Sequence, residues 1–135
     1  MRKAFERAVE INPAHLGGLI GMTRFYSNVP EIAGGSLEKA AEFARRVRAI
    51  DPYLGEAELG RVAERSEDFA EALARYEAAA QLQPGNAGMQ NACGRMLAQL
   101  GRKDEARARF EAALKLNPEF EPARKGLAAL DAPAG

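Results

Sequence analysis

The side chains best suited to catalysis or metal binding are one histidine and one cysteine, His15 and Cys93. A zinc site needs three or four histidine, cysteine or carboxylate ligands, so these two residues do not suffice. His15 follows a proline at the predicted start of a helix, and it has no partner at the spacing of a catalytic triad. We therefore expect His15 to lie at the surface or to cap the helix. Cys93 precedes a glycine on a helix-packing face, which predicts a small buried hydrophobic residue.

Three glycines lie in the segment Gly17-Gly18-Leu19-Ile20-Gly21, which superficially looks like a phosphate-binding loop. Such a loop follows a β-strand and ends in Lys-Ser or Lys-Thr, and the sequence provides neither feature. In a helix, each glycine costs about 1 kcal/mol relative to alanine. Their expected use is to let two helices approach closely or to thin the wall of a groove.

Acidic residues are frequent between positions 56 and 75, where they alternate with Arg61, Arg65 and Arg75. This alternation is typical of a solvated helical surface with weak ion pairs, and it indicates no pair of catalytic carboxylates. We therefore predict a protein that is not an enzyme and that uses no metal or cofactor. The acidic residues of this surface are Glu56, Glu58, Glu64, Glu67, Asp68 and Glu71.

Length and composition exclude several classes of partner. The chain has 135 residues, with 19 lysines and arginines against 19 aspartates and glutamates, and 47% of its residues are hydrophobic. These values predict one ordinary domain with a real core. No uncharged stretch approaches the ~20 residues that span a bilayer, and the basic run Arg45, Arg46 and Arg48 is too small to indicate nucleic-acid binding. We expect neither membrane insertion nor a nucleic-acid partner.

The elements that position these residues repeat along the chain. Four segments end in an apolar residue, a polar residue and proline, and the prolines are 39, 32 and 34 residues apart. Large or small apolar residues precede each proline by eight and five positions, and a small residue precedes three of them by twelve. This spacing is helical, and proline stops a helix. The residues are Phe5, Ala8 and Pro13; Ala40, Ala44, Val47 and Pro52; Ala72, Tyr76, Ala79 and Pro84; and Ala106, Phe110, Ala113 and Pro118.

A second helical stretch lies between successive prolines. Its pattern is Leu19, Met22, Thr23 and Tyr26 in the first copy, and Gln90, Cys93, Gly94 and Leu97 in the third. The sequence therefore predicts an all-α protein built of helix-turn-helix units. We expect about eight helices, near residues 2–12, 14–27, 36–50, 53–65, 68–82, 86–100, 103–116 and 119–131.

This unit resembles the tetratricopeptide repeat, whose pattern of about 34 residues reads W-x2-L-G-x2-Y, then A-x3-F, then P. The copy from Ala87 to Phe120 carries Gly94, Leu97, Ala106, Phe110 and Pro118 at the spacings of that family. No copy has the tryptophan, and Thr23 stands where others have glycine. The resemblance covers nearly the whole chain and implies a right-handed α-solenoid of antiparallel helix pairs.

The resemblance also implies a candidate binding surface. In such proteins the first helices of the repeats line a concave groove, and the residue after the small packing residue points into it. Here these residues are Arg24, Arg61 and Arg95, and Asn91 and Lys125 extend the series. Arginine matches carboxylates with a planar fork, and asparagine can bind both N–H and C=O of a peptide. The alternative is that the arginines pair with neighbouring acids such as Glu58 and Glu64.

Two irregularities interrupt the repeats. The longest proline spacing reflects an insertion from Asn28 to Gly35, in which Pro30 and a Gly-Gly pair predict a loop. Its apolar residues Val29 and Ile32 either anchor the loop or contact a partner. The shortest spacing predicts a tightened link after Pro52.

The first and last helices are expected to differ from the others. The chain begins on the second helix of a repeat, so the first half-repeat is missing and an apolar stripe is open on one side. We expect Phe5, Ala8, Val9 and Ile11 to pack on the next helix. Residues 119–130 predict an end helix with Phe120, Leu127 and Leu130 inward and with Glu121, Arg124 and Lys125 outward. We expect a single domain over residues 1–131, possibly a fragment of a longer chain, and a flexible tail over 132–135.

The leading functional hypothesis is a scaffold that binds an acidic peptide segment in the groove. Some relatives hold the C-terminal carboxylate of chaperones with a lysine, but Ile20 stands at the corresponding place and argues against that ligand. The alternatives are an assembly element that forms homo-oligomers through its N-terminal helix, and a carrier of a small molecule beside Leu19, Ile20 and Met22. The single cysteine and the absence of a visible export signal favour the cytoplasm.

Overall fold

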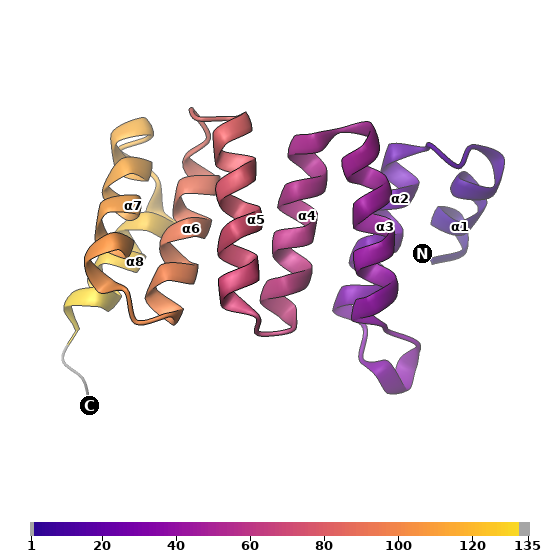
Figure 1. The fold of residues 1–135 in the computed structure, drawn as a ribbon, viewed down its shortest axis with the longest axis horizontal. Helices are drawn as coiled ribbons and strands as arrows, with labels where there is room; N and C mark the ends of the chain where they lie inside the picture. The colour runs from indigo at the N-terminus through magenta and orange to yellow at the C-terminus, as the bar shows by residue number, and fades with distance from the viewer. Residues whose placement is uncertain (1, 133–135) are drawn as a thin grey trace. The chain divides into compact units, whose positions relative to one another are not determined.

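The computed structural model describes residues 2–132 and is all-helical over that range (Figure 1). The predicted all-α repeat fold is confirmed. Over residues 2–132, eight α-helices follow one another, and a single 3-10 turn, η1 (Glu31–Ala33), lies between the second and third. The helices are α1 (Arg2–Ile11), α2 (Leu16–Asn28), α3 (Leu37–Ile50), α4 (Pro52–Arg65), α5 (Phe69–Leu82), α6 (Ala87–Gln99), α7 (Lys103–Leu116) and α8 (Glu121–Asp131).

Local side chains explain where these helices begin and end. His15 is the N-cap of α2, and its Nδ1 accepts a hydrogen bond from the Gly18 backbone N–H at 2.8 Å. Ser36 caps α3 in the same way, with its Oγ accepting from the Lys39 N–H at 3.1 Å. After α6 the chain turns at Gly101, whose φ of 78° favours glycine. The expected capping role of His15 is confirmed.

The link between α3 and α4 is a single residue. Asp51 ends α3 and caps α4, with its carboxylate accepting from the Leu54 N–H at 3.1 Å, and Pro52 occupies the first helical position. The other links that follow a second helix span residues 12–15, 83–86 and 117–120. The shortened link that the proline spacing predicts is therefore present, but it lies before Pro52 and not after it.

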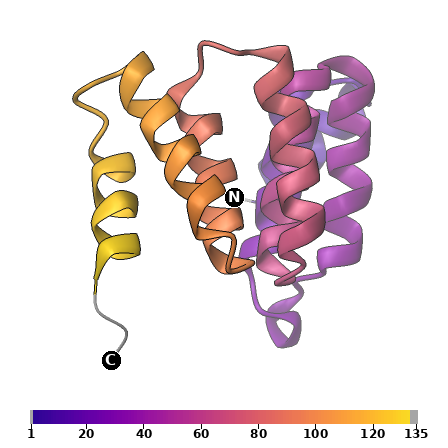
Figure 2. The same cartoon turned by 60° about the vertical axis from the view of Figure 1, so that its left-hand side comes forward.

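The chain forms two compact units, one ending at Asp68 and the other beginning at Phe69. In the first unit, α1 packs on α2, α2 on α3, and α3 on α4, and α2 also contacts α4. In the second unit, α6 packs on α5 and α7, and α8 packs on both α7 and α6 (Figure 2). Each unit thus consists of two helix pairs. The single domain over residues 1–131 stays a prediction.

The core of each unit is made by the residues whose spacing repeats. The small residues that stand twelve before a proline, Ala40, Ala72 and Ala106, are completely buried, as small residues at close helix crossings must be. The residues eight and five before the proline are also buried in α3, α5 and α7. In α1, by contrast, no residue is buried, and Phe5 and Ala8 are only half-buried. Helix α1 is therefore less completely covered by neighbouring helices than α3, α5 and α7 are.

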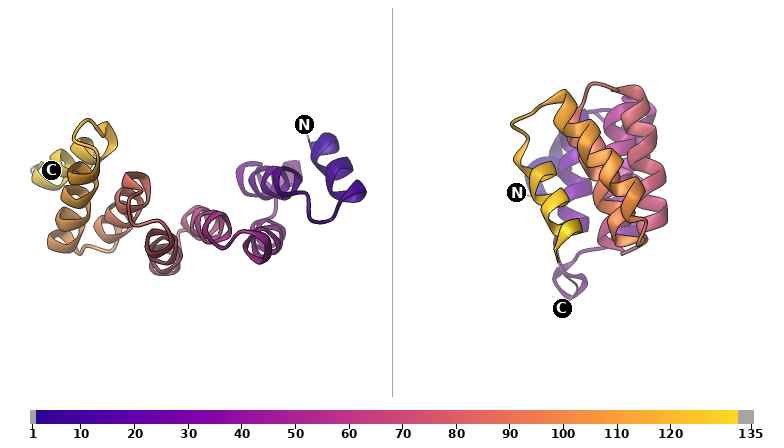
Figure 3. Two further views of the ribbon diagram at one scale, coloured as in Figure 1. Left: turned by 90° about the horizontal axis from the view of Figure 1, so that it is seen from above. Right: turned by 90° about the vertical axis from the view of Figure 1, so that its left-hand side faces the viewer.

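Glycines on α2 allow α1 to approach closely, as the sequence predicted. A Cβ on Gly21 would lie 2.3 Å from Cδ1 of Phe5, and one on Gly18 would lie 3.0 Å from Val9 and 3.1 Å from Ala8. Figure 3 shows α1 beside α2 at the N-terminal end. The expectation for Ile11 is wrong, because this side chain is 74% exposed. Its equivalents Ile50, Leu82 and Leu116 are also exposed, so the last helical turn directs this position away from the neighbouring helix.

The insertion after α2 is a loop with one short helical turn. Backbone hydrogen bonds close it, since the N–H groups of Ala33 and Gly35 donate to the Pro30 carbonyl at 2.9 and 3.0 Å. Val29 is half-buried, whereas Ile32 is 99% exposed. Val29 is thus partly covered, and partner contact by Val29 and Ile32 stays a prediction. On the end helix, Glu121, Arg124 and Lys125 are exposed as expected, and Phe120, Leu127 and Leu130 are half-buried. The tail predicted over 132–135 lies outside the described residues from position 133.

Candidate functional site

Arg24, on α2, lies in the first unit and is partly committed to an ion pair. Its Nη2 donates to Oε1 of Glu58, on α4, at 2.9 Å. The Arg24 side chain is 52% exposed, while the Glu58 side chain is only 4% exposed. The guanidinium therefore compensates a buried carboxylate with one of its nitrogens and presents the rest of its fork to solvent. For Arg24, the structure therefore shows the alternative stated above, in which a predicted groove arginine pairs with a neighbouring acid.

The prediction of a solvated surface is wrong for Glu58, which is buried. A signal for this was present in the sequence. Three residues before each predicted groove residue stand Gly21, Glu58 and Ala92, so the glutamate occupies a place where other repeats have small packing residues. A charged residue at such a place requires a partner in the fold, since an unpaired buried charge is costly. Arg24 is that partner.

Arg61 occupies on α4 the place that Arg24 occupies on α2. It is exposed and makes no hydrogen bond or ion pair with any residue in the described range 2–132. Its guanidinium is thus available to a carboxylate from outside the chain. In the first unit, Arg61 is thus the predicted cation that has no ion-pair partner within residues 2–132.

The second unit holds the remaining predicted residues, Asn91 and Arg95 on α6 and Lys125 on α8. Asn91 and Arg95 are one helical turn apart and share a face of α6. Asn91 is 7% exposed, and its Oδ1 is covered without a hydrogen-bond partner among the residues that the structure describes. Arg95 and Lys125 are both exposed. A continuous series from Arg24 to Lys125 stays a prediction, because these residues belong to two units.

A hydrophobic groove of about 490 Å³ lies between α1 and α2. Phe5 comes from α1, Ile20, Arg24 and Phe25 from α2, and Val29 from the start of the insertion. Arg2 stacks over the Phe25 ring at 5.1 Å. Asn28 also lines the groove, and its Oδ1 accepts from Nε and Nη2 of Arg65 at 3.2 and 2.6 Å. The sequence did not predict this groove, although it predicted the open side of the first helix.

Two of the three residues that the small-molecule hypothesis places beside a ligand are buried in the core. Leu19 is completely buried and Met22 is 4% exposed, so both belong to the core of the first unit. Of the three residues, Ile20 alone lines the groove.

The residues that could do chemistry have structural roles. His15 caps α2, and Cys93 is completely buried against the helix core. Burial raises the pKa of the Cys93 thiol to about 11, so the reactive thiolate is scarce at neutral pH. Within residues 2–132, no three histidine, cysteine or acidic side chains gather as a metal site would require.

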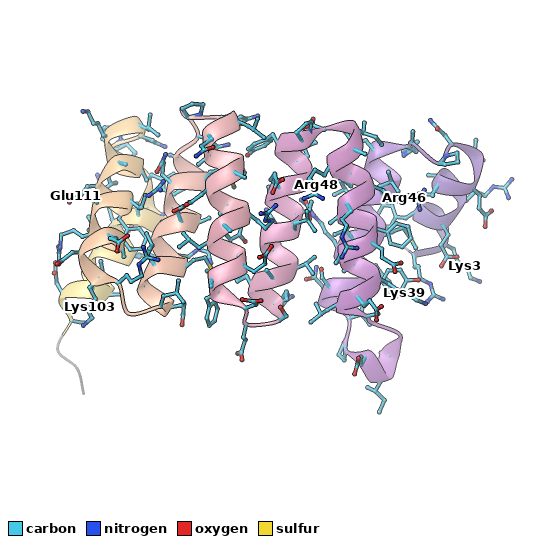
Figure 4. The ribbon with its side chains drawn as sticks, viewed as in Figure 1. Lys3, Lys39, Arg46, Arg48, Lys103 and Glu111 are labelled. Carbon is cyan, nitrogen blue, oxygen red and sulfur yellow. The ribbon has the colours of Figure 1, made fainter. Side chains whose placement is uncertain are left out.

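Basic residues on α3 are held by local contacts. Arg46 and Arg48 extend from this helix (Figure 4). Arg46 donates to the Pro13 carbonyl at 3.0 Å and lies over the Phe43 ring, and Arg48 contacts Glu56 at 3.5 Å. In the part of the chain that the structure describes, no helix has both the length and the hydrophobicity to span a bilayer.

Comparison with known proteins identifies the repeat. Residues 57–121 match the sequence model described as "Tetratricopeptide repeat". This stretch, which runs from within α4 to the start of α8, is therefore similar to tetratricopeptide repeats. The comparison with curated proteins gives no match.

Solved tetratricopeptide-repeat structures share the fold. One is TTC0263, a thermophilic protein of Thermus thermophilus, with 22% identity and a TM-score of 0.82 over 96% of this chain and 70% of that one. YrrB, described as having an unusual peptide-binding site, has 23% identity and a TM-score of 0.76 over 96% and 66%. The second domain of human RPAP3, solved with the HSP70 peptide SGPTIEEVD, has 22% identity and a TM-score of 0.70 over 87% and 99%. These likenesses establish the fold of the chain.

Proposed function

We propose that this protein is a non-catalytic interaction scaffold in which the inner helices of each unit, α2 and α4 in the first and α6 and α8 in the second, hold an acidic segment of another protein. The observation that carries the proposal is the unpaired amide oxygen of Asn91, on the same helix face as Arg95. A buried polar atom without a partner costs about 1–3 kcal/mol. A ligand N–H that pairs with this oxygen recovers that free energy. Because the oxygen is covered, binding includes a rotation of the Asn91 side chain toward the ligand.

The preference for acidic ligands follows from the accessible cations. Arg61 in the first unit and Lys125 in the second are exposed and make no hydrogen bond or ion pair with the described residues. A charge-assisted hydrogen bond to a carboxylate is worth about 1.5–3 kcal/mol. Arg24 contributes less to ligand binding than Arg61, because Glu58 already uses part of its charge.

Two of the structural neighbours support a peptide as the class of ligand. YrrB is described by its peptide-binding site, and the domain of RPAP3 was solved with a peptide. That peptide, SGPTIEEVD, contains two glutamates and one aspartate. Our proposal takes from these proteins the class of ligand alone, since Ile20 stands where chaperone-binding relatives have lysine.

Selection from a displayed library of random 12-residue peptides tests the proposal. The full chain is compared with Arg61→Glu, Lys125→Glu and Asn91→Leu, and with Lys115→Glu as a matched control on the exposed side of α7. We expect the chain to enrich acidic peptides. Arg61→Glu should weaken peptides that bind the first unit about tenfold or more, and Lys125→Glu and Asn91→Leu should do so for peptides that bind the second unit. Lys115→Glu is expected to bind like the unmodified chain. Enriched peptides without an acidic bias, or equal loss in all four variants, contradict the proposal.

A further inference from the structure

The link between α2 and α3 is longer than the repeat needs. It spans residues 29–36, whereas residues 66–68 connect α4 to α5 and residues 100–102 connect α6 to α7. Three residues therefore suffice to join a first helix to a second one in this chain. The longer link, here called the η1 loop (residues 29–36), extends beyond the ends of α2 and α3 (Figure 1). Loops held on a rigid helical scaffold are frequent sites of binding, so the extra residues can be examined for that role.

Backbone hydrogen bonds hold the η1 loop in one shape. The Gly34 N–H donates to the Glu31 carbonyl at 3.0 Å, and the Ser36 N–H donates to the Tyr26 carbonyl at 2.9 Å. Gly35 is buried, and a Cβ at this position would lie 1.7 Å from a backbone oxygen of the loop. The loop therefore closes on itself where only glycine fits. A loop that is ordered before binding loses little conformational entropy when a partner binds it.

Ile32 is the middle residue of η1 and has almost no cover. Its side chain is 99% exposed, whereas Val29 on the same loop is half-buried. The fold of the loop thus directs one large apolar side chain entirely to solvent. Burying an isoleucine side chain in an interface is worth about 10- to 100-fold in affinity. Ile32 is therefore suited to contact with an apolar residue of a partner.

A hollow of about 400 Å³ lies beside this loop, between the end of α2 and the start of α3. Val29, Pro30 and Leu37 line it with apolar side chains, and Glu31 and Glu38 line it with carboxylates. Neither glutamate side chain forms a hydrogen bond or ion pair with any residue in the described range 2–132. A lysine or arginine side chain, which has an apolar stem and a cationic head, matches this combination of groups.

The basic side chains around the η1 loop are held by other groups. Arg65 also lines the hollow, but its Nε and Nη2 donate to Oδ1 of Asn28 at 3.2 and 2.6 Å. Lys39 lies over the Tyr26 ring at 5.4 Å. Two carboxylates and one guanidinium line the hollow, which leaves an excess of one negative charge there. The charge of the hollow therefore favours a cation from outside the chain.

We propose that the η1 loop is a second interaction surface, which binds a basic and apolar segment of another protein. An apolar residue of that segment covers Ile32, and a neighbouring lysine or arginine enters the hollow and meets Glu31 and Glu38. The charge of this ligand is opposite to that of the acidic segment proposed for the inner helices. The inference is therefore independent of the proposed function.

Selection from a displayed library of 12-residue peptides that lacks aspartate and glutamate tests this surface without interference from acidic ligands. The bait is the full chain, and fluorescence anisotropy then measures the affinity of each enriched peptide. We expect enrichment of peptides that combine lysine or arginine with a large apolar residue. A selection that enriches no peptides, or peptides without this basic and apolar bias, would overturn the proposal.

Variants of the loop identify the surface that the peptides bind. Ile32→Ser removes the apolar contact and should weaken the enriched peptides about tenfold or more. The double variant Glu31→Gln with Glu38→Gln removes the charges and should weaken them about threefold or more. Ile11→Ser and Glu10→Gln are the matched controls, since they change an exposed isoleucine and an exposed glutamate in the last turn of α1. Both controls are expected to bind like the unmodified chain.

One further variant separates this surface from the proposed groove. Arg61→Glu should weaken acidic ligands of the first unit and should not weaken the basic peptides, so failure of one proposal is distinguishable from failure of the other. Far-UV circular dichroism verifies that all variants keep their helices. Equal affinity of the unmodified chain and Ile32→Ser, or an equal loss in Ile11→Ser, would overturn the proposal.

Discussion

Replacing Arg24 by methionine should destabilise the first unit, because the substitution leaves the Glu58 carboxylate buried without its cation. The two side chains meet at 2.9 Å, and Glu58 is 4% exposed. Removing one partner of a fully buried ion pair costs about 3–5 kcal/mol. Arg24 is 52% exposed, so water can partly replace it, and we expect a smaller loss of about 1–3 kcal/mol in the free energy of unfolding.

Two further variants separate the charge effect from lost packing. Glu58→Met removes the charge that needs compensation, and because an apolar side chain of similar volume suits a buried place, we expect a change within about 1 kcal/mol. The double variant Arg24→Met with Glu58→Met should then cost less than Arg24→Met alone. Arg61→Met is the matched control, since the same place on α4 has no partner within residues 2–132, and a change within about 0.5 kcal/mol is expected.

Urea unfolding followed by circular dichroism at 222 nm gives these free energies, with a separate transition fitted for each unit where two appear. An Arg24→Met variant as stable as the unmodified chain would refute the reasoning. Equal losses of unfolding free energy for Arg24→Met and Arg61→Met would refute it as well. That result would mean that removing the partner of Glu58 adds nothing to the destabilisation.

Three other predictions concern the core and the caps. Phe110→Ala should lower the free energy of unfolding by about 3–5 kcal/mol, because this ring is buried against both Gly94 and Gly126. Phe5→Ala should lower it only about half as much, because Phe5 is half-buried and packs against Gly21. Urea unfolding of both variants measures the difference. Cys93 should resist a thiol reagent at pH 8 and react fully in urea. Because its pKa rises from an ordinary 9.0 to about 11 on folding, ionisation should lower the stability of the folded chain progressively between pH 9 and 11, and Cys93→Ala should lack that component. His15→Ala should cost about 0.5–1 kcal/mol through the lost cap, measured by the thermal midpoint.

Sequence patterns predicted the helices well, because local chemistry determines where they begin and end. Pro13, Pro52 and the caps His15, Ser36 and Asp51 act within a few residues of themselves, so their effect can be predicted without knowing the fold. The shortened proline spacing gave the tight link at Asp51 for the same reason.

The candidate site was less predictable, because it depends on contacts between distant segments. Arg24 and Glu58 are 34 residues apart, and only the packing of α2 against α4 shows that one compensates the other. The same holds for the Asn91 oxygen, because its lack of a hydrogen-bond partner depends on all the segments that surround it. The Ile11 error has another origin: its hydrophobicity suggested burial, but the position of its helical turn directs it to solvent.

The central claim is that the inner helices of each unit bind an acidic protein segment, through Arg61 in the first unit and through Asn91 and Lys125 in the second. The most direct measurement is the affinity of the best peptide selected from the library, by isothermal titration calorimetry, for the full chain and for Arg61→Glu, Lys125→Glu and the control Lys115→Glu. We predict that one or both inner-helix variants bind about tenfold or more weakly, that Lys115→Glu binds unchanged, and that replacing the acidic residues of the peptide by their amides abolishes the difference. Equal affinity for all four proteins would contradict this claim.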